Sequence, residues 1–224
     1  MSKKVLVVAV HPDDETLGAG GTLLKHSALG DEIYWLIMTN VSEESGWSKE
    51  FVAKRQKEIE KVNTKYAFNK VFDLGFTPTK LDTYQLGNII AKVSKVFNEV
   101  KPNIIYLPNN SDVHSDHRIS FDAVYSCTKS FRYPFIERIL MMEVLSETEF
   151  APSISGQTFV PNTFIDISDY FEKKIDIFKC FDSEVMKNNL PRSISATKAL
   201  ANYRGSRIGV EFAEAFMLLF SNEI

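Results

Sequence analysis

Apolar residues along the chain form short continuous runs, and longer stretches with helical spacing separate them. The runs are KKVLVVAV (3–10), EIYWLIMTN (32–40), KVFDLGF (70–76), NIIYLP (103–108) and RILMMEVL (138–145). The first run is typical of a strand buried on both faces of a sheet, and the other four also predict strands. The helical stretches are 16–30, 49–66, 82–102 and 115–131. This alternation predicts a Rossmann-like, three-layer α/β fold with a mostly parallel central sheet.

The pattern loosens after Glu147, so an irregular C-terminal third is expected. Residues 148–162 are rich in Ser, Thr, Pro and Gly, which is typical of loop with at most one edge strand. A late strand is predicted at 163–167. Helices are predicted at 168–181, with Ser168 as N-cap, and at 193–205. With no repeat or linker in the sequence, one domain over residues 1–224 is the simplest organisation.

The composition argues against a nucleic-acid-binding protein and against a membrane-spanning protein. The formal net charge of the 224 residues is −3, which argues against general attraction to nucleic acid. No apolar run approaches the roughly 20 residues that span a bilayer. The two cysteines, Cys127 and Cys180, form no CxxC pair and are expected to be buried free thiols. These features favour a cytoplasmic protein.

A histidine and three acids follow the first predicted strand, in the segment HPDDE. Ligand sites in open α/β sheets lie beyond the carboxyl ends of the strands. Asp13 or Asp14 could simply cap the next helix, and His11 could be a hydrogen-bonded core residue. A divalent cation instead explains why His11 joins the acids on one turn, since histidine nitrogen and aspartate oxygen are its ligands. Glu15 is expected to hydrogen-bond within this turn.

The loop after the fourth strand, NNSDVHSDHR, contains two more histidines. His114 and His117 stand at i and i+3, a spacing that shares one helix face. Taken alone, they could be a solvated helix start. Because both loops should reach the same sheet edge, three of the four histidines would gather there with several acids.

The segments AVHPDDETLGAGGTLLKH and HSDHR resemble the LmbE/PIG-L family of zinc-dependent N-deacetylases. Weaker matches are Thr39–Asn40, the helix around Arg55, the LGF segment and the RG…AEAF segment near the C-terminus. The resemblance implies removal of the acetyl group from an N-acetylglucosamine-type amino sugar or its conjugate, by metal-activated water with an aspartate base. It also implies a small-molecule substrate.

Site roles follow from the resemblance. It implies that His11, Asp14 and His117 bind zinc and that Asp13 is the general base. The same ligands also suit Fe²⁺ and Co²⁺. His114, as an imidazolium, is our candidate donor to the oxyanion, and Asp116 is expected to orient one imidazole.

Basic residues between 186 and 210 suggest contacts to the rest of the substrate. No acid occurs in this segment, and a solvated helical face is the simpler explanation. The sharper hypothesis is that Arg192 and Arg204 meet an anionic group such as phosphate. With Arg55, they are the predicted substrate-binding residues.

Two alternative functions remain open on the sequence alone. One is a metal-dependent hydrolase of another amide or ester bond, including a phosphoesterase. Another is a non-catalytic Rossmann-like nucleotide-binding module, suggested by GAGG at 18–21, although its spacing is not GxGxxG. The sequence also leaves the oligomeric state open, and exposed surface on the C-terminal third could serve a homo-oligomer.

Overall fold

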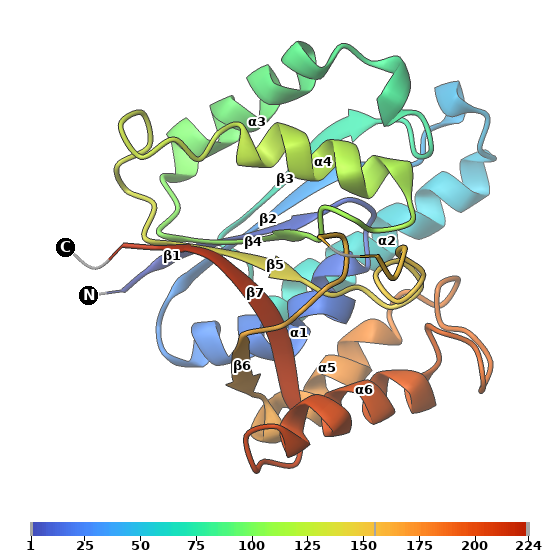
Figure 1. The fold of residues 1–224 in the computed structure, drawn as a ribbon. Helices are drawn as coiled ribbons and strands as arrows, with labels where there is room; N and C mark the ends of the chain where they lie inside the picture. The colour runs from blue at the N-terminus through green and yellow to red at the C-terminus, as the bar shows by residue number, and fades with distance from the viewer. Residues whose placement is uncertain (1, 155, 223–224) are drawn as a thin grey trace.

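The computed structural model describes residues 2–154 and 156–222, which form a seven-stranded sheet between layers of helices (Figure 1). The strands are β1 (Lys4–Ala9), β2 (Glu32–Thr39), β3 (Lys70–Phe76), β4 (Ile104–Pro108), β5 (Arg138–Met142), β6 (Thr163–Asp166) and β7 (Ala213–Ser221). Their order in the sheet is β3-β2-β1-β4-β5-β7-β6. Strands β1 to β5 are parallel, and β7 runs antiparallel to β5 and β6. The predicted mostly parallel α/β fold is confirmed.

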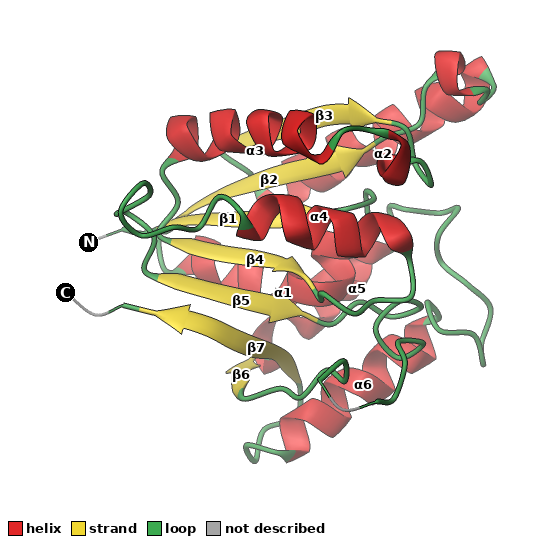
Figure 2. Cartoon of the chain, turned by 45° about the horizontal axis from the view of Figure 1, so that its top comes forward, coloured by secondary structure: helices red, strands yellow, loops and turns green. Residues whose placement is uncertain are grey.

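Helices cover both faces of the sheet (Figures 1 and 2). They are α1 (Asp14–Ala28), α2 (Lys49–Tyr66), α3 (Leu86–Val100), α4 (Ser115–Tyr125), α5 (Phe171–Phe178) and α6 (Ile194–Ser206). Along β1, Val5 and Val7 pack into the core on the α1 side, while Leu6 and Val8 pack on the α3 side. The two-sided burial explains why the β1 sequence is apolar without alternation.

The C-terminal third is more regular than its sequence pattern suggests. It contributes α5, α6 and β6, which were predicted, and β7, which was not. Its longest strand, β7, pairs with both β5 and β6. The predicted cap was wrong: Ser168 opens a short 3-10 turn, and Tyr170 is the N-cap of α5.

Helix α1 lies very close to its neighbours, and two glycines make this possible. A Cβ atom added at Gly18 would lie 2.7 Å from the Met142 sulfur, and one at Gly21 would lie 2.6 Å from Ile167. The Gly21 N–H also donates to a Glu214 carboxylate oxygen at 2.9 Å. The GAGG segment therefore serves helix packing, which argues against a phosphate-binding loop.

We expect Gly21→Ala to lower the free energy of unfolding by about 1–3 kcal/mol, the usual effect of overpacking. The added methyl group would collide with the buried Ile167 side chain. Gly87→Ala is the matched control, because Gly87 also lies in a helix and its added Cβ would meet no atom within 4 Å. Urea denaturation of both variants measures the difference, and equal stabilities would contradict the packing argument.

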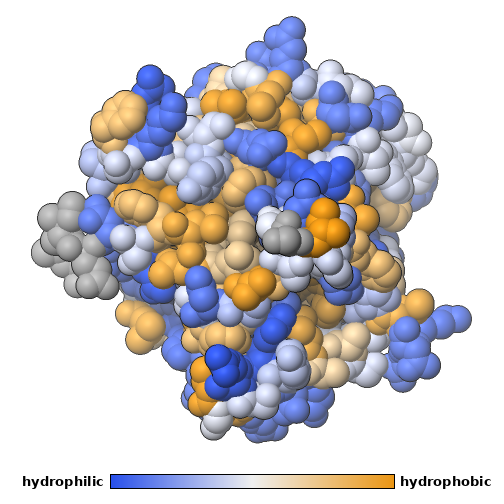
Figure 3. All heavy atoms as spheres, viewed as in Figure 1, coloured by the Kyte–Doolittle hydropathy of each residue, from blue (hydrophilic) through white to orange (hydrophobic). Residues whose placement is uncertain are grey.

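Three further features concern the surface, the cysteines and the absence of a membrane-spanning helix among the described residues. On the face in Figure 3, apolar residues gather near the centre and hydrophilic residues surround them. Cys127 is buried and Cys180 is half-buried, and both are free thiols. No helix in residues 2–154 and 156–222 has the length and apolar character needed to cross a membrane.

Candidate metal centre and its cavity

The turn that joins β1 to α1 is organised around Asp14. Its Oδ2 atom accepts the backbone N–H groups of Val10 at 2.9 Å and His11 at 2.8 Å. Asp13 occupies the N-cap position with a φ of 139°, a strained value for a non-glycine residue, yet its side chain makes no capping hydrogen bond. Helix capping therefore does not account for the Asp13 carboxylate. As expected, Glu15 bonds within the turn, since its Oε2 accepts the Asp13 N–H.

The loop after β4 is organised around Asp112, which is fully buried. One Asp112 oxygen lies 2.9 Å from His117 Nδ1, and the other accepts from Asn109 at 3.0 Å and Thr148 at 2.7 Å. Because an ionised carboxylate only accepts, this network assigns the His117 proton to Nδ1. The lone pair of His117 is then on Nε2, which lies 3.4 Å from Asp14 Oδ2.

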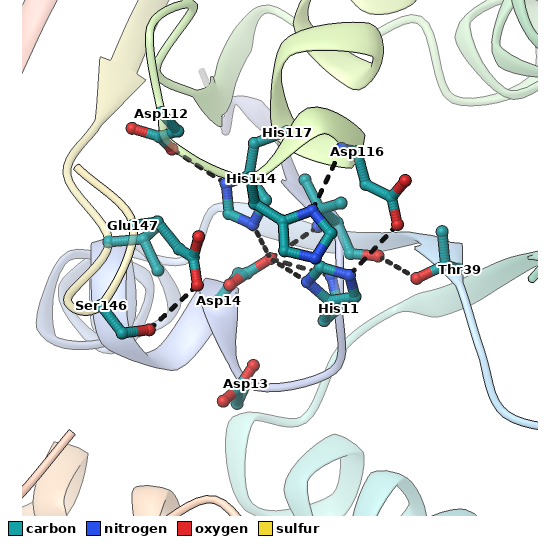
Figure 4. Close-up of polar contacts among 12 residues, drawn as sticks. His11, Asp13, Asp14, Thr39, Asp112, His114, Asp116, His117, Ser146 and Glu147 are labelled. Atoms are coloured by element: carbon teal, nitrogen blue, oxygen red, sulfur yellow. Dashed lines mark hydrogen bonds and ion pairs between the residues drawn. The ribbon is translucent and has the colours of Figure 1, made fainter. Parts of the chain in front are cut away.

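Side chains from the two loops meet at the carboxyl edge of the parallel strands (Figure 4). His11, Asp14 and His117 each offer a ligand atom within 4.8 Å of the other two. His117 Nε2 is buried and has no hydrogen-bond partner among the described residues. A buried lone pair without a partner is destabilising, and a His-Asp-His set suits a divalent cation. These residues therefore fit a metal ion.

The charges around His117 also favour a cation. Burial lowers the pKa of His117, but the carboxylates of Asp14 and Asp112 outweigh burial and raise the pKa to about 9. The Glu147 carboxylate acts in the same direction. This surplus of negative charge attracts either a proton or a metal ion to the imidazole.

A second group of candidate ligands overlaps the first, since His11, His114 and Asp116 also lie close together. Its atoms are already engaged. The two Asp116 oxygens accept the backbone N–H groups of Thr79 at 2.6 Å and Leu81 at 3.1 Å. His114 Nδ1 accepts the Asp116 N–H at 3.1 Å. Both groups need His11, so only one of them can be complete at a time, which argues against a two-metal phosphoesterase.

Asp13 is the carboxylate left without a partner. Its residue is 4% exposed, it lines the cavity beside the ligands, and no described hydrogen-bond donor reaches its carboxylate (Figure 4). Burial raises the pKa of Asp13 well above its usual range, and the Asp14 carboxylate raises it further. A neighbouring carboxylate, Glu184, adds to this effect, whereas Arg192 opposes it.

His114 and Asp116 flank the cluster. Burial lowers the pKa of His114, and neighbouring His11 lowers it further, so the neutral ring is favoured over the predicted imidazolium. With Nδ1 accepting a hydrogen bond, a neutral His114 carries its proton on Nε2 and can still donate there. Asp116 Oδ2 lies 3.5 Å from His11 Nε2, a position that suits the expected orienting task.

Two of the three predicted substrate-binding arginines, Arg55 and Arg192, line the cavity. Both form ion pairs with Glu184, Arg192 at 3.2 Å and Arg55 at closer range. Arg55 also donates to the Pro12 carbonyl at 3.1 Å. Arg55 also pairs with Glu58 at 3.4 Å, so its charge is compensated before any ligand enters, whereas Arg192 shares Glu184 with Arg55 and keeps an Nε without a hydrogen-bond partner among the described residues.

The structure does not bring Arg204 to this cavity. Its guanidinium makes two hydrogen bonds of 2.7 Å to the Glu143 carboxylate, and it lines a different hollow beside Leu200. The bidentate pair satisfies the charge of Arg204 at the end of α6. The predicted contact between Arg204 and substrate therefore has no support in this arrangement.

Several residues of the site were not singled out in the sequence. The cavity has a volume of about 160 Å³, and Trp47, Glu147 and Glu184 line it. Asp112 could have been found from its place in the same loop as His117, five residues earlier. Trp47 follows β2 at the same sheet edge, which is a weaker signal. For Glu184 we find no signal in the sequence.

We expect Asp112→Asn to weaken metal binding by roughly 10- to 100-fold, as changes behind a metal-binding histidine usually do. The amide still accepts from His117 Nδ1 but lacks the negative charge that makes Nε2 a stronger ligand. Competition with a chromogenic chelator measures the affinity, and a thermal melt checks the fold. Asp122→Asn, at an exposed position on α4, is the control. Equal affinities in the two variants would contradict this role.

A comparison with known protein families finds one whose model matches this chain. The family model PIG-L, described as GlcNAc-PI de-N-acetylase, matches residues 6–128, which is more than half of the chain. The matched span includes both loops of the candidate metal centre.

Relatives and a solved structure extend this likeness beyond the matched span. A diacetylchitobiose deacetylase of Thermococcus kodakarensis is 25% identical over 221 residues, covering 95% of this chain and 81% of the relative. A probable N-acetyl-alpha-D-glucosaminyl L-malate deacetylase 2 of Bacillus cereus is 27% identical over 184 residues, covering 78% and 80%. The structure of N,N'-diacetylchitobiose deacetylase from Pyrococcus horikoshii superimposes with a TM-score of 0.77 at 23% identity, covering 97% of this chain and 84% of that one. This last likeness shows a shared fold.

Proposed function

The chain belongs to the PIG-L family of GlcNAc-PI de-N-acetylases, and from this premise we propose that it is a metal-dependent N-deacetylase. Its substrate would be an N-acetylglucosamine-type amino sugar or a conjugate of one. The observation that carries the proposal is His117 Nε2, which has no hydrogen-bond partner among the described residues and lies beside Asp14 and His11, next to the Asp13 carboxylate that lines the cavity. The two curated relatives, both named as deacetylases, support the same reaction.

His11, Asp14 and His117 would hold the cation. We infer zinc, because two histidines and a carboxylate with a free coordination position match catalytic zinc sites, although Fe²⁺ and Co²⁺ accept the same ligands. When bound, the cation supplies Lewis acidity, which polarises the acetamide carbonyl and acidifies a water molecule.

The remaining chemistry belongs to side chains. Asp13 takes a proton from the attacking water and delivers it to the leaving amine, a task that suits a carboxyl whose pKa is raised toward the working pH. His114 donates from Nε2 to the carbonyl oxygen as negative charge develops there. The water oxygen adds to the acetyl carbon, the C–N bond then breaks as the amine nitrogen takes the proton, and the products are acetate and a free amino sugar.

Acetate release from a panel of N-acetylated sugars tests the proposal. The zinc-loaded protein should release acetate, a chelator should abolish the activity, and added zinc should restore it. If the loaded protein releases no acetate from any of these sugars but cleaves other amides or esters, the general metal-hydrolase alternative holds instead. A protein that binds no metal would contradict both readings.

We also place the enzyme in the cytoplasm. Cys127 and Cys180 are free thiols, as expected of a protein in a reducing compartment. Fractionation of cells that express the protein at native level checks this placement.

A further inference from the structure

Trp47 is a large apolar side chain left at the mouth of the catalytic cavity. It is 43% exposed, whereas the other tryptophan of the chain, Trp35, is fully buried. The Trp47 ring stacks on Phe51, with ring centroids 4.8 Å apart and 20° between the planes. An exposed tryptophan that stacks on a half-buried phenylalanine, with both rings lining a cavity, marks a surface for binding a ligand.

The loop that carries Trp47 is held in place before any ligand arrives. Ser42 and Ser45 form a reciprocal capping box around a short 3-10 turn. Gly46 ends this turn with a φ of 94°, and Ser48 then caps α2 by accepting the Phe51 N–H. Trp47 thus lies between a capped 3-10 turn and the capped start of α2. Because its loop is already ordered, the loop loses little conformational entropy when a ligand stacks on Trp47.

The lining of the cavity divides by chemistry. Val41, Trp47, Phe51 and Pro78 supply apolar surface, while His11, Asp13 and Asp14 supply polar groups. A pyranose ring has the same division, with C–H bonds on its faces and hydroxyl groups on its edges. Apolar walls with a few convergent polar groups are typical of small-molecule sites.

Apart from the charge of the bound cation, the side chains around the two arginines favour a neutral group on the ligand. Arg55 and Arg192 are its two arginines, and both are paired with Glu184. The carboxylates of Asp13 and Glu147 also line the cavity. An anionic group would meet these carboxylates and would have to compete with Glu184 for the arginines, which argues against a phosphate contact at Arg192 even though Arg192 Nε has no hydrogen-bond partner among the described residues.

On the basis of the proposed function, we propose that the substrate is a neutral saccharide of at least two rings. The N-acetylated ring lies at the metal ligands, and the apolar face of the next ring stacks on Trp47. The exposures support this order, because Asp13 at the floor is 4% exposed and Trp47 at the mouth is 43% exposed.

Kinetics of Trp47→Ala test the stacking. For zinc-loaded enzyme, we expect the ratio of the KM for N,N'-diacetylchitobiose to the KM for N-acetylglucosamine to rise roughly 2- to 12-fold, the range of an aromatic contact. In Trp47→Phe the ratio should return most of the way to the wild-type value. Phe131→Ala, which removes a 78% exposed aromatic outside the cavity, is the matched control. An unchanged ratio in Trp47→Ala would overturn the proposal.

Fluorescence separates this proposal from the proposed function. Because Trp35 is buried, emission that changes when N,N'-diacetylchitobiose is titrated into the zinc-loaded protein reports on Trp47. The change should saturate in the wild type and vanish in Trp47→Phe. Saturable binding without acetate release would overturn the deacetylase function and leave the stacking site intact. Acetate release without the emission change would overturn the stacking site and leave the deacetylase function intact.

Charge preference is tested with N-acetylglucosamine 1-phosphate against the methyl glycoside of N-acetylglucosamine. The neutral glycoside should have the lower KM at moderate ionic strength. A lower KM for the phosphate would overturn the neutral assignment and return Arg192 to its predicted role as an anion contact.

Discussion

Asp13→Asn is expected to keep its metal and its melting temperature while its kcat falls by about 10²- to 10⁴-fold, the usual loss when general acid–base catalysis is removed. The amide matches the carboxylate in shape but cannot take a proton from water. The substitution removes no described hydrogen bond to the side chain, so the fold should be unaffected. Metal content, a thermal melt and kcat at saturating substrate measure the three quantities.

The same variant should alter the dependence of kcat on pH. Burial raises the pKa of Asp13, and the Asp14 carboxylate adds to the shift. Only the ionised form can accept a proton, so wild-type kcat should fall as the pH drops through this raised pKa. In Asp13→Asn, this fall of kcat at low pH, the acidic limb of the pH profile, should be missing. If the limb persists, or if most of the activity remains, Asp116 or Glu15 becomes the base to examine.

Asp82→Asn is the control for this variant, because Asp82 is an exposed aspartate that does not line the cavity. Its kcat and pH profile should match the wild type. Loss of metal in Asp13→Asn but not in Asp14→Ala would exchange the roles assigned to the two neighbours.

Asp14→Ala is expected to lose the metal and, with it, the activity. Asp14 Oδ2 lies 3.4 Å from His117 Nε2 and also accepts the N–H groups of Val10 and His11. The substitution therefore removes a ligand, a negative charge and the bonds that shape the turn. The loss of affinity should exceed the roughly 10- to 100-fold effect of a change behind a ligand.

Equilibrium dialysis against buffered zinc measures the affinity of Asp14→Ala, and activity is followed as zinc is raised. Asp122→Ala, at an exposed position on α4, is the control and should bind zinc like the wild type. A melting curve of the metal-free proteins separates loss of the ligand from loss of the fold. Stoichiometric zinc in Asp14→Ala at the wild-type affinity would remove Asp14 from the metal centre.

Much of the fold was predictable because burial dictates the sequence of its elements. Strands buried on both faces must be apolar throughout, and this rule located β1, β2, β4 and β5, whereas β3 lies at the sheet edge and is mostly half-buried or exposed. Helix α2 occupies the predicted span, Lys49–Tyr66, because its buried residues recur with helical spacing between Ser48, which caps it, and Ala67, where it ends. Helix α4 ends at Tyr125, earlier than predicted, since the residues after it turn toward β5.

The strand β7 shows where pattern reasoning fails. Its sequence, AEAFMLLFS, has neither clear alternation nor clear helical spacing, and a short apolar run of this kind is compatible with either element. Its place is decided by β5 and β6, which it joins by antiparallel pairing across a long stretch of chain. Such non-local pairing leaves no signal in the local sequence.

The sequence by itself determined the candidate metal centre. His11, Asp14 and His117 lie in loops after parallel strands, and chain topology obliges such loops to meet at one sheet edge. Only the tertiary structure decided the partners that set their chemistry. Asp112 faces His117, Glu184 compensates both Arg55 and Arg192, and Glu143 holds Arg204 away from the cavity. The physical reason is that protonation and charge compensation depend on which side chains become neighbours after packing, and most of these neighbours come from distant parts of the chain.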